Sequence, residues 1–212
     1  ELGGVLLARH APRRLAALAR HPSDTVRGWV AYAVTRGPEP APAAPGAPAP
    51  GAPPSLDRVL DAIRPLAADT HSGVREWAWI AARPAVAREL DRALALLQPW
   101  TLDADDNIRR FASEITRPRG VWCAHLEPLK RDPTPGLVLL EPLRADPARY
   151  VQNSVANWLN DAGKSRPDVV RAVLERWTRG DLRGGGRGRG SDTVAPATTY
   201  IARRAARSFK AE

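Results

Sequence analysis

A single cysteine, Cys123, is present among the 212 residues of the sequence. One thiol cannot form an internal disulfide, and the lack of a cysteine pair favours a reducing compartment. Long apolar runs are lacking too: none approaches the ~18 residues of a membrane span, and we expect no signal peptide. The sequence starts at Glu1 without a methionine, which is compatible with a trimmed N-terminus. These absences favour a cytoplasmic protein.

Metal and cofactor motifs are lacking as well. The four histidines have no metal-ligand spacing: His10, His21, His71 and His125. Cys123 together with His125 supplies too few ligands for a zinc site. Residues 183–192, rich in Gly and Arg, lack the strand and helix that flank a phosphate-binding glycine motif. They are interpreted as a surface loop or as an Arg-Gly segment that touches phosphates. We therefore predict no metal and no cofactor.

Positive charge is abundant. The formal net charge is +9 and the sequence pI is about 10.8. Such an excess favours an anionic partner, most often nucleic acid. Alternatively, a GC-rich genome raises the Arg and Ala content of its proteins whatever their partners. Net charge alone does not distinguish this origin from a nucleic-acid partner.

Helical periodicity dominates, because period-two alternation and clusters of β-branched residues are nearly absent. The expected helices cover residues 2–20, 23–36, 55–68, 71–83, 88–99, 105–116, 121–130, 135–144, 147–162, 167–177 and 196–210. Ser23, Ser55 and Asp105 are candidate helix caps. Residues 38–54, almost all Pro, Ala and Gly, predict an extended, mobile connector. The fold class is all-α.

A repeat recurs within these helices, and its anchors are Val26, Val74, Ile108, Val151 and Ala202. The anchor spacings scatter around the 40–47 residues of HEAT-type helix pairs. They predict an α-solenoid with a concave basic groove, built as a single domain over residues 1–212 that carries the 38–54 and 183–192 segments as insertions.

Each anchor but one is followed by an arginine, namely Arg27, Arg75, Arg109 and Arg203. In stacked helical repeats such an arginine often pairs with an aspartate of the next repeat, so we expect a structural role. Aromatic residues stand three positions after three anchors: Trp29, Trp77 and Phe111. The simplest interpretation places them in the core or between repeats.

Three of the four asparagines stand in one expected helix, residues 147–162, together with Asp161. Val151, Val155, Trp158 and Leu159 share one face of that helix and predict its core stripe. Asn153, Asn157, Asn160 and Asp161 fall on another face, which we expect to meet a groove or water. Carboxamides there suit fixed hydrogen bonds to a phosphate, sugar or base edge.

A second acid precedes this helix. Glu114 lies with Arg110 and Arg117 at i, i+4 and i+7 on one helix face, and its place in the repeat matches that of Asn157. We expect Glu114 and Asp161 to point into the same surface, although an ion pair within one helix is the simpler account of Glu114. Trp122 follows at the rim, as a core residue or as a platform for a ligand.

The motifs "RRFASE", "RPR", "W" and "YV..SVAN.LND", in that order over residues 66–180, resemble the bacterial DNA alkylation repair glycosylases of the AlkC branch, in the superfamily of AlkC and AlkD. The similarity extends to "TYIARRAARS" near the end. The resemblance implies cleavage of the N-glycosidic bond of cationic N-alkylated bases such as 3-methyladenine, with no metal or cofactor. It also implies that Asp161 is the key carboxylate, and that Glu114, Trp122 and Glu76 match other active-site positions.

Such a leaving group is already cationic, so we expect a carboxylate to stabilise an oxocarbenium-like sugar and to position water. Trp122 would stack on the charged base. The expected substrate and DNA contacts are Trp122, Trp77, Asn153, Asn157, Asn160, Arg110, Arg117, Arg119, Lys164, Arg203, Arg204 and Arg207. The predicted partner is double-stranded DNA with alkylated bases, and the predicted protein is a bacterial, nucleoid-associated monomer. A non-catalytic DNA-binding solenoid and a protein-interaction scaffold are the alternatives.

Overall fold

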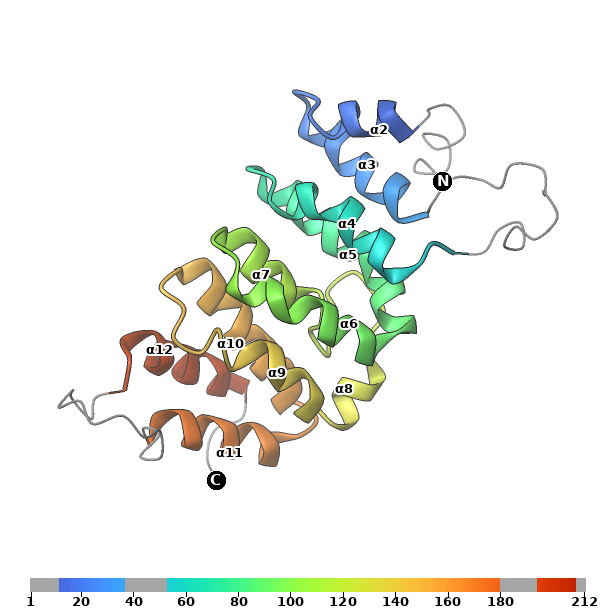
Figure 1. Cartoon of the computed structure of the whole chain (residues 1–212). Helices are drawn as coiled ribbons and strands as arrows, with labels where there is room; N and C mark the ends of the chain where they lie inside the picture. Colours follow the sequence, from blue (N-terminus) through green and yellow to red (C-terminus); the bar gives the residue numbers. More distant parts are fainter. Residues whose placement is uncertain (1–11, 37–52, 180–193, 209–212) are drawn as a thin grey trace. The chain divides into compact units, whose positions relative to one another are not determined.

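The structure is a computed structural model that describes residues 12–36, 53–179 and 194–208 (Figure 1). These residues form α-helices and short 3-10 helices joined by turns, and none of them is in a strand. The chain divides into two compact units, residues 1–93 and 94–212. The predicted all-α class and the solenoid of helix pairs are confirmed, whereas the single domain and the concave groove stay predictions.

Unit 1 contains two stacked helix pairs (Figure 1). The helices are α2 (Pro12–Leu18), α3 (Asp24–Arg36), α4 (Leu56–Ala67) and α5 (Ser72–Arg88). The pairs touch where Gly28 meets the ring of Trp77, because a Cβ on Gly28 would lie 2.1 Å from that ring. Only glycine permits this approach, so the stacking of α3 on α5 depends on it.

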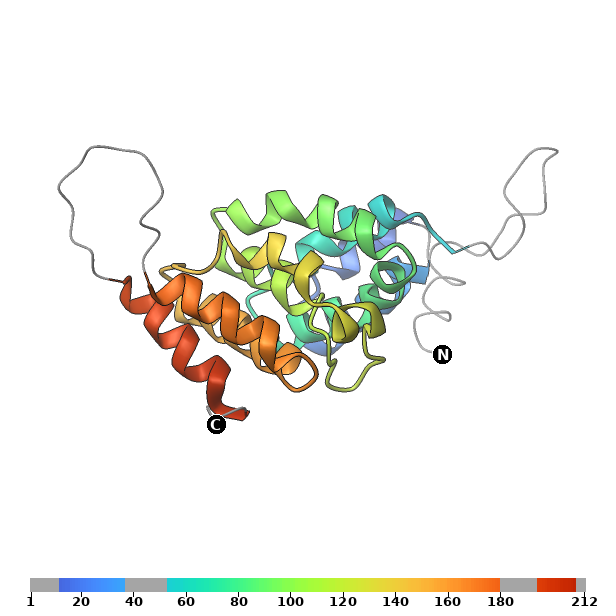
Figure 2. The ribbon, with the colours of Figure 1, turned by 90° about the horizontal axis from the view of Figure 1, so that it is seen from below.

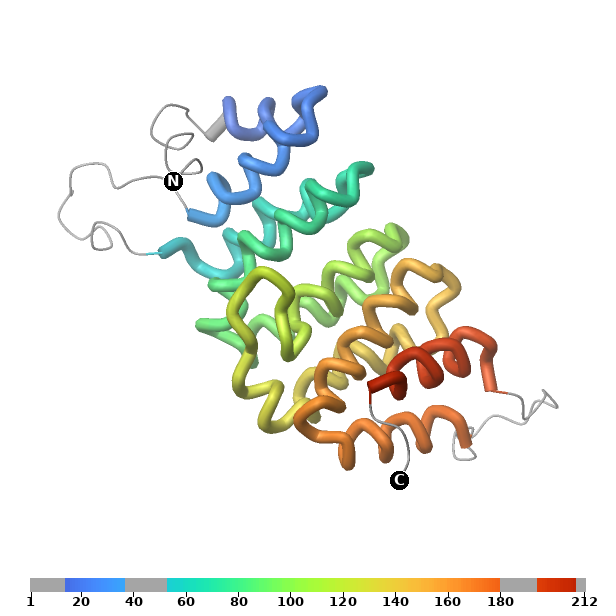
Figure 3. The backbone as a smooth tube through the Cα atoms, turned by 180° about the vertical axis from the view of Figure 1, so that it is seen from behind, coloured from blue at the N-terminus to red at the C-terminus, as the bar shows by residue number. Residues whose placement is uncertain are grey.

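Unit 2 is organised around α10 (Arg149–Gly163), which contacts α7 (Asp106–Glu114), α11 (Pro167–Thr178) and α12 (Pro196–Ala205). Figure 3 shows α10 running between α7 and α12, and Figure 2 shows α11 beside α12. Shorter elements complete the connections: α6 (Leu90–Leu97), which spans the unit boundary, η1 (Gln98–Leu102), α8 (Glu127–Arg131), η2 (Thr134–Gly136), α9 (Leu137–Leu140) and η3 (Ala206–Ser208). The helix α10 is thus the core of this unit.

Most expected helices are present, with three clear differences. Of the helix expected over 135–144, only α9 is α-helical, and η2 precedes it. The helix expected over 121–130 is wrong for its first part: residues 117–126 form a loop closed by the Leu126 amide donating to the Pro118 carbonyl, and α8 begins at Glu127. Pro128 explains the start, because its ring suits the first turn of a helix and disrupts the interior. The helix α5 continues past Pro84 to Arg88, since Ala85 and Val86 are buried.

Parts of other predictions fall outside the described residues. The Gly/Arg-rich segment 183–192 does so entirely, and the Pro/Ala-rich segment 38–54 does so apart from Pro53 and Pro54. The helix expected over 2–20 is described only from Pro12 onward. Of the candidate caps, Asp105 accepts a hydrogen bond from the Asn107 amide, whereas Ser55 precedes α4 without a side-chain cap.

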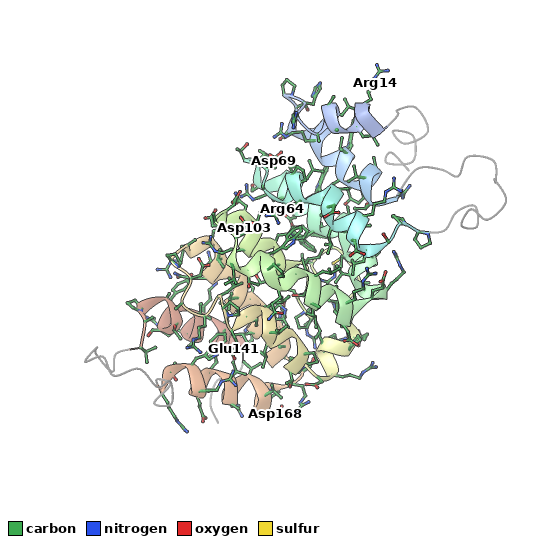
Figure 4. The ribbon with its side chains drawn as sticks, in the orientation of Figure 1. Arg14, Arg64, Asp69, Asp103, Glu141 and Asp168 are labelled. Carbon is green, nitrogen blue, oxygen red and sulfur yellow. The ribbon has the colours of Figure 1, made fainter. Side chains whose placement is uncertain are left out.

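Arginine clamps join successive repeats within each unit. The Arg27 guanidinium donates to both oxygens of Asp69 in unit 1, and Arg109 does the same to Asp146 in unit 2. The remaining nitrogen of each arginine donates to two carbonyls of the turn before its own helix. Asp69 is labelled in Figure 4, at the turn between α4 and α5. The predicted pairing of these two arginines with an aspartate of the next repeat is confirmed.

A further arginine, Arg75, makes the same contacts to its preceding turn, where Nη1 donates to the carbonyls of Asp69 and Thr70. Burial raises the pKa of the Asp69 carboxyl, but hydrogen bonds from Arg27 and from the His71 amide outweigh it, so the pKa lies below its usual value. These clamps fix the turns from which each repeat helix starts.

Replacing Asp146 by Asn tests the clamp. The Asp146 side chain is 4% exposed, so the substitution leaves the Arg109 charge almost buried without its counterion. We expect a loss of about 3 kcal/mol in the free energy of unfolding, measured by urea denaturation. The matched control is Asp168→Asn in the same unit, since Asp168 pairs with Arg166 in an exposed position. An equal shift of the denaturation midpoint in both variants would contradict the clamp.

Candidate active site

The helix α10 fixes the position of Asp161. Val151, Val155, Trp158 and Leu159 are fully buried, which confirms the predicted core stripe. The Trp158 indole donates to the hydroxyl of Thr116, and its ring lies against Gly136, where a Cβ would come within 2.4 Å. Because the stripe holds one face of α10 in the core, Asp161 on another face has a fixed direction toward the C-terminus of α7.

Arg117 joins the two carboxylates predicted to share a surface. Its Nη1 donates to Glu114 Oε1 at 2.6 Å, while its Nε and Nη2 donate to Asp161 Oδ2 at 2.9 and 2.6 Å. On the other side, Lys164 Nζ donates to Asp161 Oδ1 at 3.1 Å. Arg110 Nη2 lies 3.2 Å from Glu114 Oε2. We call these five residues the carboxylate network, and it brings Glu114 and Asp161 together as expected.

Burial and charge have opposing effects inside the carboxylate network. The Glu114 side chain is 5% exposed, and burial raises its pKa. The charges of Arg110 and Arg117 and a hydrogen bond from Ser154 outweigh that effect, so the pKa of Glu114 falls below its usual value. Burial likewise lowers the pKa of Arg117, but the two carboxylates raise it above the usual value. Glu114 is therefore an ionised group under neutral conditions.

Ser154 is a member of the site that the sequence analysis missed. Its hydroxyl donates to Glu114 Oε2 at 2.7 Å, from a position seven residues before Asp161 on α10. That spacing of two helical turns places both residues on one face of the helix, and it is the signal that could have identified Ser154 from the sequence. Ser154 completes the hydrogen bonding of a buried carboxylate.

The other predicted arginines near the carboxylate network have defined partners. Arg110 donates to the Tyr150 carbonyl and stacks 4.0 Å from the centre of the Tyr150 ring. Arg119 donates to the Asp161 carbonyl and to the Ser165 hydroxyl. Both arginines are half-buried. Their contact with DNA stays a prediction.

The asparagines of α10 bind the C-terminal helix. Asn160 is 1% exposed, and its amide donates to the Ala205 carbonyl while its oxygen accepts from Ser208. The prediction that Asn160 faces a groove or water is therefore wrong, and it is wrong for Asp161 too, which is 3% exposed. A buried carboxamide needs partners for both of its polar atoms, and the backbone and hydroxyl at the end of α12 supply them.

The two other asparagines of this face are half-buried. Asn153 Oδ1 accepts from the Tyr200 hydroxyl at 2.6 Å, and Asn157 Oδ1 accepts from Arg207 at 3.0 Å. Both partners belong to α12 or to η3, directly after it. The asparagine face is thus an attachment surface for α12, and direct binding of DNA by Asn153 or Asn157 stays a prediction.

Three arginines at the end of the described chain are exposed: Arg203, Arg204 and Arg207. Desolvation lowers the pKa of Arg207, and repulsion from Arg204 and Arg117 adds to this, while the negative charge of Asp161 opposes it. Arg207 therefore lies within the electrostatic reach of the carboxylate network, although its own hydrogen bond goes to Asn157. Arg207 of η3 thus adds positive charge near Asp161.

Trp122 is an exposed residue in a strained conformation. Its side chain is 84% exposed, and its φ of 64° places it in the left-handed region. The interpretation of Trp122 as a core residue is wrong, because Pro118 and Gly120 keep residues 117–126 out of a helix and the loop carries the indole outward. A bulky residue in this conformation is rare, and such strain concentrates at functional sites. The platform interpretation of Trp122 remains as the prediction.

Two predicted residues belong to unit 1. Glu76 is exposed, and Trp77 is 36% exposed, with its ring against Gly28 and edge-on to Tyr32. Trp77 is thus partly an interface aromatic, as expected for the repeat. Phe111 in unit 2 is buried and confirms its core assignment. The proposed roles of Glu76 and Trp77 in substrate binding stay predictions.

Within the described ranges, no group of three or more His, Cys, Asp or Glu side chains has the arrangement of a metal site. None of the helices in those ranges is both long enough and apolar enough to cross a membrane.

Comparison with known proteins gives likenesses in sequence and in fold. No family model matches the sequence. The uncharacterized protein YhaZ of Bacillus subtilis is 47% identical over 66 residues, which make up 31% of this chain and 18% of YhaZ. The chain thus spans less than a fifth of that relative.

Solved structures match over nearly the whole chain. The alkylpurine DNA glycosylase AlkC of Pseudomonas fluorescens, solved with DNA containing an abasic site analog, matches with a TM-score of 0.66 and 28% identity. That match covers 94% of this chain and 47% of AlkC, so the chain spans about half of AlkC.

Two Streptococcus mutans proteins share the fold. AlkD2 matches with a TM-score of 0.67 and 17% identity. The match covers 99% of this chain and 89% of AlkD2. The protein smu.31 matches with a TM-score of 0.65 and 16% identity. The match covers 97% of this chain and 90% of smu.31. The resemblance first seen in the motifs is therefore confirmed for the fold.

Lowering the pH tests the ionised state of Glu114. Since its folded pKa is depressed, its contribution to stability is full above the unfolded value of 4.5 and is lost as the pH falls through the folded pKa. We expect Glu114→Gln to be less stable than the native protein at pH 7, and the difference to shrink below pH 4.5. Urea denaturation at a series of pH values measures this. A difference that does not depend on pH would contradict it.

Substitutions of Trp122 test the strain in its loop. Glycine adopts the left-handed conformation freely, whereas alanine does not, and both remove the exposed indole. We expect Trp122→Gly to be more stable than Trp122→Ala by about 1 kcal/mol in denaturation experiments. Equal stability of the two variants would show that the loop relaxes and that no strain is held at residue 122.

Proposed function

We propose that this chain, which has the HEAT-like helical-repeat fold of the AlkC/AlkD superfamily, is a DNA glycosylase that removes alkylated bases from DNA. The likeness to AlkC of Pseudomonas fluorescens supports a role in alkylation repair, because that protein is an alkylpurine DNA glycosylase bound to DNA with an abasic site analog. The proposed substrates are cationic N-alkylated bases such as 3-methyladenine in double-stranded DNA.

One observation carries the proposal: Asp161 and Glu114 are two carboxylates joined through Arg117 in a strongly basic protein. Carboxylates repel phosphate, so a DNA-binding protein needs a reason to keep two of them together, and here both are almost buried. The cations of the carboxylate network compensate the two negative charges, and Arg119 and Arg207 lie nearby. DNA can then approach while a carboxylate stays available for chemistry.

The chemistry follows from the charge of the substrate. A base carrying an added alkyl group on nitrogen is cationic and leaves as a neutral molecule, so the enzyme needs no general acid. As the glycosidic bond breaks, positive charge develops on the sugar, and a negative carboxylate placed beside it stabilises that transition state. Asp161 takes this role and orients the attacking water. Glu114 fixes Arg117, which in turn holds Oδ2 of Asp161.

Other residues bind the substrate. Trp122 presents an indole that can stack on the cationic base, and the arginines of α12 and η3 can hold backbone phosphates. A damaged base pair costs less to open than an intact one, which helps selection of the lesion. Glu76 and Trp77 of unit 1 are further candidates for substrate contact.

A non-catalytic DNA-binding protein is the second candidate, and one observation favours it. The Asp161 side chain is 5% exposed, and cations occupy both of its oxygens. A buried carboxylate whose oxygens are both paired with cations is also what a purely structural ion pair would give. Such a protein binds DNA with a steep dependence on salt but leaves no abasic sites. A protein-interaction scaffold would bind a protein partner and show no DNA affinity at moderate salt.

Base release from methylated duplex DNA tests the proposal. We expect the native chain to release 3-methyladenine and to leave abasic sites. Asp161→Asn should lose at least about 100-fold in single-turnover rate because it removes the charge that stabilises the sugar cation. Binding of DNA by this variant should persist.

The matched control is Asp168→Asn, an exposed acid of α11 in the same unit, which should act at the native rate. Binding without base release by the native chain would favour the non-catalytic candidate. Base release at the native rate by Asp161→Asn would remove Asp161 from the mechanism.

A further inference from the structure

Asp161 is covered in this structure by two cations of different kinds. Arg117 is 13% exposed and is held at the same time by Glu114, so it cannot leave Oδ2 without leaving a second buried carboxylate. Lys164 is 44% exposed and reaches Oδ1 across a single contact of 3.1 Å. Oδ1 is therefore the oxygen that can be uncovered, and Lys164 is the group that has to move.

The chemistry of lysine suits such movement. Its ammonium is a compact, well-hydrated charge on a flexible stem, whereas the arginine fork holds a carboxylate through two fixed hydrogen bonds. Only three of the 32 basic residues of the chain are lysines: Lys130, Lys164 and Lys210. Lys164 is thus the one flexible cation of the carboxylate network, since the other two cations, Arg110 and Arg117, are planar arginines.

We propose that Lys164 is a releasable cover on Asp161, withdrawn from Oδ1 by a phosphate of the DNA backbone. The proposal rests on the proposed function, because it concerns access to the same carboxylate. In the free protein Lys164 neutralises Asp161, and this removes the repulsion that a bare carboxylate would exert on incoming DNA. In the complex the ammonium binds phosphate, and Oδ1 faces the sugar.

The free energies involved favour transfer of the Lys164 ammonium from Asp161 to a DNA phosphate. A partly exposed ion pair between residues three apart on a helix contributes only about 0.5 kcal/mol or less. Binding of a DNA phosphate releases condensed counterions, which adds a gain that a carboxylate cannot give. Arg119 and Arg207 lie near the same carboxylate network and attract the phosphate to it. Release of Lys164 from Asp161 is therefore cheap, and its transfer to DNA is favourable.

The variant Lys164→Gln distinguishes a lysine that leaves Asp161 when DNA binds from a lysine that stays on Asp161 and positions it during the reaction. As a cover, Lys164 has already left Asp161 when the bond breaks, so the variant should bind DNA more weakly and still release bases at a rate within about twofold of native once DNA is saturating. The slope of log affinity against log salt should become shallower by about 0.9, the value for one lost phosphate contact. Single-turnover release from methylated duplex DNA and binding across a salt series measure both.

A double-mutant cycle on binding isolates the contact with Asp161. In Asp161→Asn the ammonium no longer has a carboxylate to leave, so it is free to bind phosphate. We expect Lys164→Gln to cost about twofold more affinity in the Asp161→Asn background than in the native one, for an undamaged duplex, because only in the native background does the lysine lose an ion pair when it binds phosphate. Lys130→Gln is the matched control, because Lys130 also pairs with an acid three residues away, the exposed Glu127. Its salt slope and rate should stay native.

Three results would overturn the proposal. The first is a large loss of rate in Lys164→Gln at saturating DNA, which would mean that the lysine acts on Asp161 during the reaction. The second is a native salt slope in that variant. The third is an equal cost of Lys164→Gln in both backgrounds. Failure of the proposed function looks different, because the native chain would then release no base at all, whereas binding would still report on Lys164.

Discussion

The hydrogen bonds of Arg117 to Glu114 and Asp161 are the interaction on which the rest of unit 2 depends. They place one guanidinium between two carboxylates that are almost buried, at the junction of α7 with α10. Burial of any one of these charges alone would be costly, so the three groups are stable only together. The packing of the fully buried Val155, Trp158 and Leu159 holds the two helices close enough for this contact. Hydrophobic packing and charge pairing therefore support each other here.

Arginine has two separate tasks in this protein, and geometry distinguishes them. Arg27 and Arg109 each grip one aspartate and two turn carbonyls, which fixes the start of a repeat. Arg117 occupies a different place, after the end of α7, and holds acids instead of turns. Chemical type alone does not separate the two tasks, since the same guanidinium serves both. Their positions relative to the helix anchors do separate them, and those positions follow from the repeat.

The asparagine face of α10 has a structural role that restricts the functional one. Asn153, Asn157 and Asn160 bind Tyr200, Arg207 and the backbone of Ala205, so they hold α12 and η3 against α10. Arg207 is thereby brought within electrostatic reach of Asp161. The asparagines of α10 are thus explained by their hydrogen bonds to α12 and η3 rather than by a surface open to water.

The sequence by itself determined the helical class, the repeat anchors, the Arg27 and Arg109 clamps and the meeting of Glu114 with Asp161, because periodicity and spacing along a helix fix which residues share a face. Tertiary structure decided three further points. Asn160 became buried because α12 covers it, Trp122 became exposed because its loop is not helical, and Lys164 came to cover Asp161. Spacing along a helix predicts which residues share a face, but the loop conformation at Trp122, the side-chain contact at Lys164 and the packing of α12 on Asn160 depend on the folded structure.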